Sequence, residues 1–200
     1  MKNYCIQCIL LFVTFLSFSQ TFDQKIEDLI NENLYETIEL RHWFHQNAEL
    51  SNREFKTAAR IADELKKIGY EPMTGIAKTG VVAILNPGKP GPVVGLRADI
   101  DALPVKERAD IPWASKMKGV YNGEEVPVMH ACGHDMHTAI LLAAAKILYD
   151  IKDEIPGQVK FIFQPAEEGA PPGEEGGAEL MVKEGVLKNP DVDAIFGLHV

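Results

Sequence analysis

Apolar residues recur every three or four positions in four stretches of the chain. Residues 22–49 and 54–68 carry such positions with charged residues between them, which is typical of amphipathic helices covering one face of a core. The second helix is expected to end at Gly69, because glycine readily adopts the left-handed conformation of a helix C-terminus. Residues 136–149 and 178–184 are predicted to form two further helices.

Four short, nearly continuous apolar runs are predicted to be strands, at residues 81–85, 93–96, 159–163 and 193–198. The segment between the first two (NPGKPGP) is rich in turn formers, so we predict that these two strands form a hairpin. The third run is almost wholly apolar, which is typical of a strand buried in a parallel sheet. Residues 105–128 show no clear period and are predicted to be irregular.

The alternation of helices and strands predicts an α/β fold with a mixed, largely parallel sheet flanked by helices. In such sheets ligands bind at the carboxyl ends of the strands. Polar residues that could bind a ligand follow three of the predicted strands: Asp99, Asp101, Glu167, Glu168 and His199. We therefore expect these side chains to meet at one edge of the sheet.

Residues 129–137 (MHACGHDMH) hold a thiol, three imidazoles and a carboxylate directly before a predicted helix. Cys132 and His134 are spaced so that both can reach one metal ion, and sulfur with nitrogen suits zinc or another borderline cation. Asp135 would be free to accept the outer N–H of an imidazole, and the helix N-terminus would favour the thiolate. The alternative is a buried apolar cysteine among structural histidines, which the density of donors makes the weaker interpretation.

These donors are too many for a single cation with an open position, so the sequence suggests two metal ions, with Cys132 as a plausible bridge. Of the adjacent glutamates, one would bind metal and the other would accept a proton from water. The physical argument does not fix which of Glu167 and Glu168 has which task.

Composition describes a globular chain with one sizeable core or a piece of a larger protein, since 46% of its 200 residues are hydrophobic and 24% are charged. The net charge of -9 and the absence of a Lys/Arg-rich run argue against a nucleic-acid partner.

The N-terminus has the pattern of a secretory signal peptide over residues 1–19, with Lys2, an apolar stretch at 9–18 and Ser17 and Ser19 before a cleavage point at Gln20. The apolar stretch is shorter than the roughly 20 residues needed to span a bilayer, so we expect export to the periplasm or medium without a stable membrane anchor. Cleavage would remove Cys5 and Cys8 and leave Cys132 as the one cysteine of the mature chain.

Four motifs, in this order, resemble the M20 metallopeptidase family, and most closely its amidohydrolase branch, which acts on N-acyl amino acids, hippurate and auxin conjugates. They are residues 96–104 (LRADIDALP), 130–135 (HACGHD), 163–169 (FQPAEEG) and 197–199 (GLH). The resemblance runs from about residue 45 to the last residue, although the family usually has Pro in place of Ala48.

By this resemblance Glu167 is the catalytic base, and the metal ligands are Cys132, His134, Glu168 and His199. Other branches of the family bind metal through His-x-Asp where this chain has Asp99 and Asp101, so these two carboxylates are expected to support the ligands from behind. The resemblance implies two divalent cations, zinc or manganese first, with cobalt or nickel allowed.

The implied substrate is a small N-acyl amino acid or peptide. A carboxypeptidase or dipeptidase of the same family, or a non-catalytic metal-dependent binding protein, stays open as an alternative. Family members are considerably longer, with a lid or dimerisation domain and a final metal-binding histidine. We therefore expect residues 20–200 to be the N-terminal portion of the catalytic domain, inactive alone and with an open sheet edge, and the full-length form to be a possible homodimer.

Overall fold

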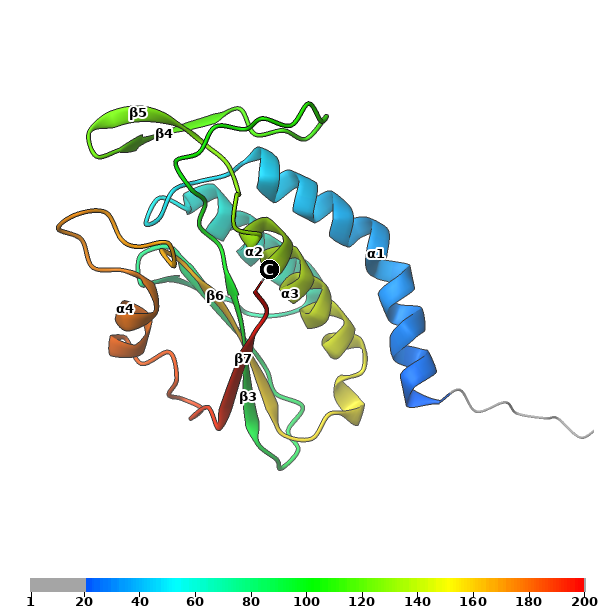
Figure 1. Ribbon diagram of the computed structural model, residues 1–200. Coiled ribbons are helices and arrows are strands. Elements are labelled where there is room, and N and C mark those ends of the chain that lie inside the picture. Colours follow the sequence, from blue (N-terminus) through cyan, green and yellow to red (C-terminus); the bar gives the residue numbers. More distant parts are fainter. Residues whose placement is uncertain (1–20, 200) are drawn as a thin grey trace, which may run out of the picture.

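The computed structural model describes residues 21–199, so the predicted signal peptide lies outside the described residues. Its centre is a five-stranded sheet in the order β1-β2-β6-β3-β7 (Figure 1). The strands are β1 (Met73–Ile76), β2 (Gly80–Leu85), β3 (Val93–Asp99), β6 (Gln158–Gln164) and β7 (Ala194–Gly197). β3 runs parallel to β6 and β7, whereas β2 is antiparallel to β6 and to β1. The predicted mixed α/β sheet is thus confirmed.

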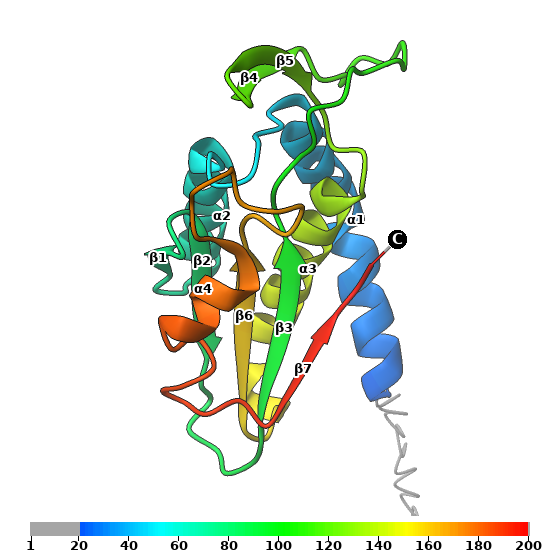
Figure 2. The same ribbon diagram turned by 60° about the vertical axis from the view of Figure 1, so that its left-hand side comes forward.

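Helices cover both faces of the sheet. α1 (Phe22–Gln46), α2 (Phe55–Ile68) and α3 (His134–Asp150) lie on one face, and the short α4 (Gly177–Lys183) lies on the other (Figure 2). A 3-10 turn, Lys152–Glu154, follows α3. α2 ends at Gly69 in the left-handed conformation, as predicted. No helix between residues 21 and 199 combines the length and the apolar content that crossing a bilayer requires.

The central strand β6 is buried on both sides, which explains its continuous apolar sequence. Phe161 and Phe163 pack into the main core beneath α1, α2 and α3, while Ile162 packs with Met181 of α4 on the opposite face. Lys160, on the same strand, is 2% exposed and donates to three carbonyl oxygens of residues 186–190 at 2.8–3.0 Å. A buried ammonium is tolerated here because all three of its protons are hydrogen-bonded.

The predicted hairpin between residues 81–85 and 93–96 is wrong. β6 lies between these two strands and pairs with both of them. Turn-forming residues determine where the chain bends, but they do not determine whether the two strands on either side of the turn pair with each other. The strand with two apolar faces takes the central position because only there are both faces covered.

The segment predicted to be irregular contains a two-stranded hairpin of β4 (Met117–Tyr121) and β5 (Glu124–Val128), which stands apart from the main sheet (Figure 1). Most of its residues are exposed, and its inner apolar residues, Met117, Val126 and Val128, pack against Leu50 in a small separate cluster. The turn at Asn122 and Gly123, with φ of 52° and 83°, carries the local signal that could have revealed it.

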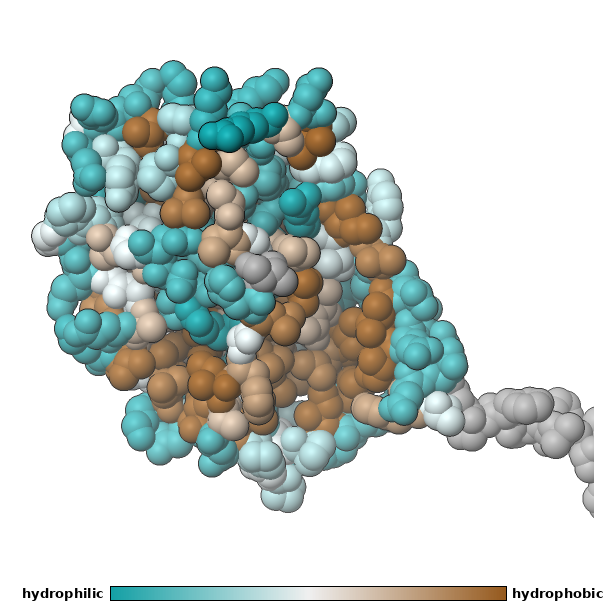
Figure 3. Space-filling view, in the orientation of Figure 1, coloured by the Kyte–Doolittle hydropathy of each residue, from teal (hydrophilic) through white to brown (hydrophobic). Residues whose placement is uncertain are grey.

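β7 forms an open edge of the described sheet, as predicted. Its exposed apolar side chains are Ile195 and Phe196, and Leu198 follows them. Figure 3 shows the apolar area over this edge and the neighbouring helices.

Candidate metal centre

The carboxyl ends of three parallel strands meet the start of α3. β3, β6 and β7 point toward the same edge of the sheet in Figure 2. Three groups of potential ligand atoms form there, and within each group the atoms lie within 4.8 Å of one another: Cys132, His134 and His199; Asp99, His134 and His137; and His134, Glu167 and Glu168. The structure therefore brings together all of the residues that the sequence analysis proposed as ligands or base, with His134 shared by all three groups.

His134 is held so that one ring nitrogen is free. Its Nδ1 lies 2.8 Å from the Asp101 carbonyl oxygen and 3.3 Å from the Asp101 carboxylate, so Nδ1 carries the hydrogen. Nε2 is buried without a hydrogen-bond partner in the described part of the chain, 3.6 Å from a Glu167 oxygen and 4.0 Å from one of Glu168. Burial lowers the pKa of His134, but the hydrogen bond and charge of Asp101 outweigh it and raise this pKa to about 8.

Asp101 orients two of the candidate ligands at once. Besides its contact with His134, its carboxylate accepts from the Ser51 hydroxyl at 2.7 Å and from the backbone N–H of Glu168 at 3.0 Å. Burial by itself would raise the pKa of Asp101, yet the hydrogen bonds from His134 and Ser51 bring this pKa below its usual value. The side chain therefore stays ionised and lies behind the ligands, where the sequence analysis expected a supporting residue.

Asp99, which the sequence analysis expected to support the ligands from behind, lies next to the candidate ligand atoms themselves. Asp99 is 2% exposed, and its carboxylate forms an ion pair with Arg97 and lies within 4.8 Å of potential ligand atoms of His134 and His137. Burial raises the pKa of Asp99 to about 6. By position, Asp99 is a potential ligand as well as a supporting group.

The thiol of Cys132 does not have the environment predicted for it. Gly133, with φ of 75°, caps α3, so Cys132 lies outside the helix, with Sγ 3.7 Å from His199 Nε2. Burial, and then the hydrogen bond to Glu168, raises the pKa of the thiol, which opposes the thiolate form expected from the helix N-terminus. The nearby carboxylates of Glu168, Glu167 and Asp99 raise this pKa further, and negative charge of this kind favours a bound cation.

Two further histidines of the motif were not assigned a role from the sequence. His130 and His137 are 5% and 2% exposed, and neither ring nitrogen of either has a hydrogen-bond partner within residues 21–199. His137 follows His134 by three positions on α3, a helical spacing that places both on one side and could have identified it.

Asp135 belongs to a neighbouring cluster. Its carboxylate accepts from His45 Nδ1 and from Arg41 Nε, both at 2.9 Å, and His45 Nε2 lies 2.8 Å from Glu107. Asp135 does accept an imidazole N–H, as expected, but from a histidine of α1 and not from one of the candidate ligands.

A strained turn presents the two glutamates to His134. Ala166 has φ of 49°, and its N–H donates at 2.9 Å to Glu54, whose other oxygen accepts from Thr79 at 2.6 Å. Glu54 is fully buried, and burial raises its pKa to about 7. The turn is therefore fixed from inside the protein, and Glu167 and Glu168 are oriented by backbone anchoring.

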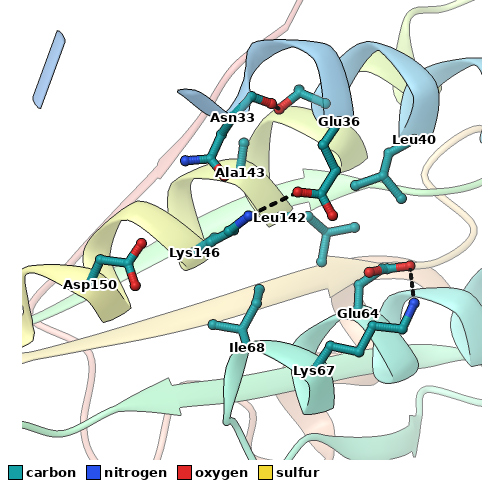
Figure 4. A pocket seen from close by; sticks show the side chains of 11 residues that line it. Asn33, Glu36, Leu40, Glu64, Lys67, Ile68, Leu142, Ala143, Lys146 and Asp150 are labelled. Atoms are coloured by element: carbon teal, nitrogen blue, oxygen red, sulfur yellow. Dashed lines mark hydrogen bonds and ion pairs between the residues drawn. The ribbon is translucent and has the colours of Figure 1, made fainter. Parts of the chain in front are cut away.

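A second hollow, a cleft of about 270 Å³ between α1, α2 and α3, has a different character (Figure 4). Four of its charged side chains pair with each other, Lys146 with Glu36 at 2.8 Å and Lys67 with Glu64 at 2.9 Å. Within residues 21–199, none of the buried side-chain atoms that lack a hydrogen-bond partner lines this cleft, in contrast to the edge of the sheet.

Comparison with known proteins agrees with this geometry. Residues 95–200 match the model of peptidase family M20/M25/M40. The chain is 44% identical over 178 residues to thermostable carboxypeptidase 2 of Saccharolobus solfataricus, covering 88% of this chain and 40% of that protein. It is 42% identical over 177 residues to the N-acyl-L-amino acid amidohydrolase of Geobacillus stearothermophilus, covering 88% and 44%.

A solved structure is similar as well. The dinuclear metal binding peptidase of the M20 family from Bacillus subtilis superposes with a TM-score of 0.73 at 39% identity, over 84% of this chain and 44% of that one. The chain thus spans less than half the length of these relatives.

Proposed function

The chain belongs to peptidase family M20/M25/M40, and we propose that its site binds two divalent cations and hydrolyses the amide bond of N-acyl amino acids or small peptides. The observation that carries this proposal is His134. Its Nδ1 is fixed by Asp101, while its buried Nε2 lacks a partner among the described residues and faces two carboxylates. This is the arrangement in which an imidazole binds a metal.

The donors present fit a pair of borderline cations. We assign Cys132, His134, Glu168 and His199 as the ligands, with zinc or manganese as the first candidates and cobalt or nickel as compatible ones. When bound, such cations supply Lewis acidity, which polarises the scissile carbonyl and acidifies water.

The chain's own residues supply the proton transfers. The Glu167 side chain is 33% exposed, against 22% for Glu168, and the backbone N–H of Glu168 is bonded to Asp101. The freer carboxylate, Glu167, takes the proton of the attacking water, holds it at a carboxylate oxygen and delivers it to the nitrogen of the leaving amine. Glu168, anchored by its backbone, is suited to a fixed ligand position.

A carboxypeptidase activity is the second candidate, favoured by the carboxypeptidase at 44% identity. Both activities cleave an amide with the same machinery and differ in the group on the acyl side.

We further propose that the protein is exported after cleavage before Gln20. The supporting pattern is Lys2, the apolar stretch at residues 9–18, and the small residues Ser17 and Ser19.

Release of free amino acid from N-acyl amino acids by the full-length protein tests the proposal. We expect activity that a chelator abolishes, that added zinc or manganese restores, and that Glu167→Gln removes without loss of bound metal. Metal binding without turnover of any N-acyl amino acid or peptide would instead identify a binding protein. Activity that survives Glu167→Gln would refute the assigned base.

A further inference from the structure

The tip of the β4–β5 hairpin consists of an asparagine followed by a glycine, and it is open to solvent. Asn122 and Gly123 are both exposed and connect Tyr121 to Glu124, the last pair of the hairpin ladder. Their φ values of 52° and 83° form a tight two-residue turn, which asparagine and glycine adopt with little strain. A Cβ atom built on Gly123 would meet no heavy atom within 4 Å beyond its chain neighbours, so the space beside this residue is empty.

Two chemical groups of this turn can react with each other, and both are free of hydrogen bonds. Within residues 21–199, neither the Asn122 carboxamide nor the Gly123 backbone N–H has a hydrogen-bond partner. A backbone nitrogen attacks the carboxamide carbon of the preceding asparagine most readily when no acceptor holds its hydrogen and no side chain obstructs its approach. Glycine has no side chain, so the approach of the Gly123 nitrogen is unobstructed.

The other asparagines of the described chain lack at least one of these conditions. Asn86 and Asn189 precede proline, whose nitrogen carries no hydrogen. The side-chain amides of Asn47 and Asn52 donate to backbone carbonyl oxygens at 2.8 and 3.0 Å. The remaining ones lie inside α1, where helical hydrogen bonds hold the backbone N–H groups.

We propose that Asn122 is a site of spontaneous deamidation, in which the Gly123 nitrogen closes a ring on the Asn122 side chain. The nitrogen forms a bond to Cγ, the bond between Cγ and Nδ2 breaks, and ammonia leaves with the proton of the Gly123 N–H. Water then opens the resulting succinimide ring at one of its two carbonyl groups, which gives aspartate or isoaspartate. Nothing is oxidised or reduced, and water is the co-reactant.

This modification changes one wall of a pocket beside the metal centre. The pocket has a volume of about 240 Å³, and its lining includes Asn122, Tyr121 and Glu168. Either product adds a negative charge to a lining that already contains the Glu168 carboxylate. Isoaspartate also adds a CH2 group to the main chain, which a two-residue turn cannot accept while Tyr121 and Glu124 stay paired.

The base of the hairpin is anchored, so the change stays at the tip. Val128 is buried in a small apolar cluster with Leu50 and Ala102. Leu103 and Met129, which follow these segments, exchange two backbone hydrogen bonds of 3.1 Å. The pairing near residues 121–124 is therefore expected to loosen while the base of the hairpin keeps its place.

Incubation of the protein in mildly alkaline buffer, followed by tryptic digestion and mass spectrometry, tests the proposal. The peptide of residues 119–146 contains Asn122 as its one amide side chain, and we expect it to exchange NH2 for OH. Labelling of this peptide by an isoaspartyl methyltransferase identifies the isoaspartate product. The peptides that contain Asn86 and Asn189 should stay unchanged. Hydrogen exchange of the incubated protein should become faster at residues 121–124 and stay unchanged at Val128.

Asn122→Gln is the matched control, because it keeps a neutral carboxamide but moves it one CH2 group away from the Gly123 nitrogen. This variant should remain unmodified and unlabelled under the same conditions. An intact Asn122 in the protein, under conditions that modify a synthetic peptide of residues 119–125, would overturn the proposal, because the turn would then protect the side chain. Equal modification at Asn86 or Asn189 would overturn it as well. These measurements need no turnover of substrate, so their outcome is independent of the proposed function.

Discussion

Two clusters of buried histidines lie next to each other at the start of α3, and they differ in how their ring nitrogens are used. His45 is 5% exposed and has both nitrogens paired, with Asp135 and Glu107. His134 is 1% exposed and has Nδ1 bound to Asp101, while Nε2 faces carboxylates with which it forms no hydrogen bond.

Both clusters are buried and contain the same residue types. They differ in whether each ring nitrogen has a hydrogen-bond partner. In the paired cluster, formed by Arg41, His45, Glu107 and Asp135, the acidic and basic side chains bond to each other. These contacts connect α1 to α3. In the open cluster, around His134, ring nitrogens of His130, His134 and His137 have no hydrogen-bond partner within residues 21–199. Burying them unpaired costs free energy unless another group binds there. The open cluster is therefore the site of chemistry, and the paired cluster is its support.

The largest expected effect comes from the carboxylate assigned to proton transfer. Glu167→Gln should lower kcat by about 10²–10⁴-fold, the range for loss of a general base, and should leave the metal content unchanged. Steady-state kinetics and metal analysis of the same preparation measure both. Glu179→Gln, at an 81% exposed side chain on α4, is the control and should behave as the unsubstituted protein.

Next in size is the effect of removing the shared ligand. His134→Ala should weaken metal binding by more than the roughly 10–100-fold that loss of an outer partner costs, because it deletes a donor common to all three candidate ligand groups. His45→Ala should leave metal affinity unchanged. Equal losses of metal affinity in the two variants, measured by competition with a chelator, would remove the distinction between the clusters.

Loss of the group behind His134 should have a smaller effect. Asp101→Asn keeps the size of the side chain but weakens its hold on His134 Nδ1 and on the Glu168 N–H. We expect metal affinity to fall by about 10–100-fold while the fold is retained. Metal affinity equal to that of the unsubstituted protein would show that the ligands do not depend on this carboxylate.

The smallest functional effect is expected in the paired cluster, where the change appears in stability. His45→Gln should lower the free energy of unfolding by about 1–3 kcal/mol, because buried carboxylates lose a partner. The hydrogen bond to Asp135 raises the pKa of His45 above 6.5, so this stabilisation is fully present below pH 6.5 and declines as pH rises through the raised value.

Urea unfolding at several pH values measures this effect. The difference between the unsubstituted protein and His45→Gln should shrink toward alkaline pH. Gln46→Ala, which removes an uncharged side chain that donates to the Pro112 carbonyl oxygen at 3.2 Å, is the control and should show no such pH dependence. A difference that grows with pH would contradict the assigned pairing.

The sequence was sufficient for the features that depend on local pattern. Strand ends followed by Asp99, Glu167 and His199 predicted a shared edge, since parallel strands present their carboxyl ends on the same side. The spacing of Cys132 and His134 before a helix predicted that both side chains reach one metal site, and the structure places them together.

The sequence was not sufficient where distant segments choose their partners. The insertion of β6 between β2 and β3 depends on which strand has two apolar faces to bury, a comparison across the whole sheet. The partner of Asp135 is His45, 90 residues away, and no local spacing indicates it. Likewise, the pKa of the Cys132 thiol is raised by burial and by Glu168 from another strand end, neither of which a helix-terminus argument could include.

The central claim is that divalent cations bind where the open cluster converges, and anomalous diffraction from crystals of the full-length protein grown with manganese tests it most directly. We predict two anomalous peaks per chain within bonding distance of side chains among Cys132, His134, Glu168 and His199, with one peak at His134 Nε2. Peaks located elsewhere, or none while His134 Nε2 is hydrogen-bonded to a protein group, would contradict it.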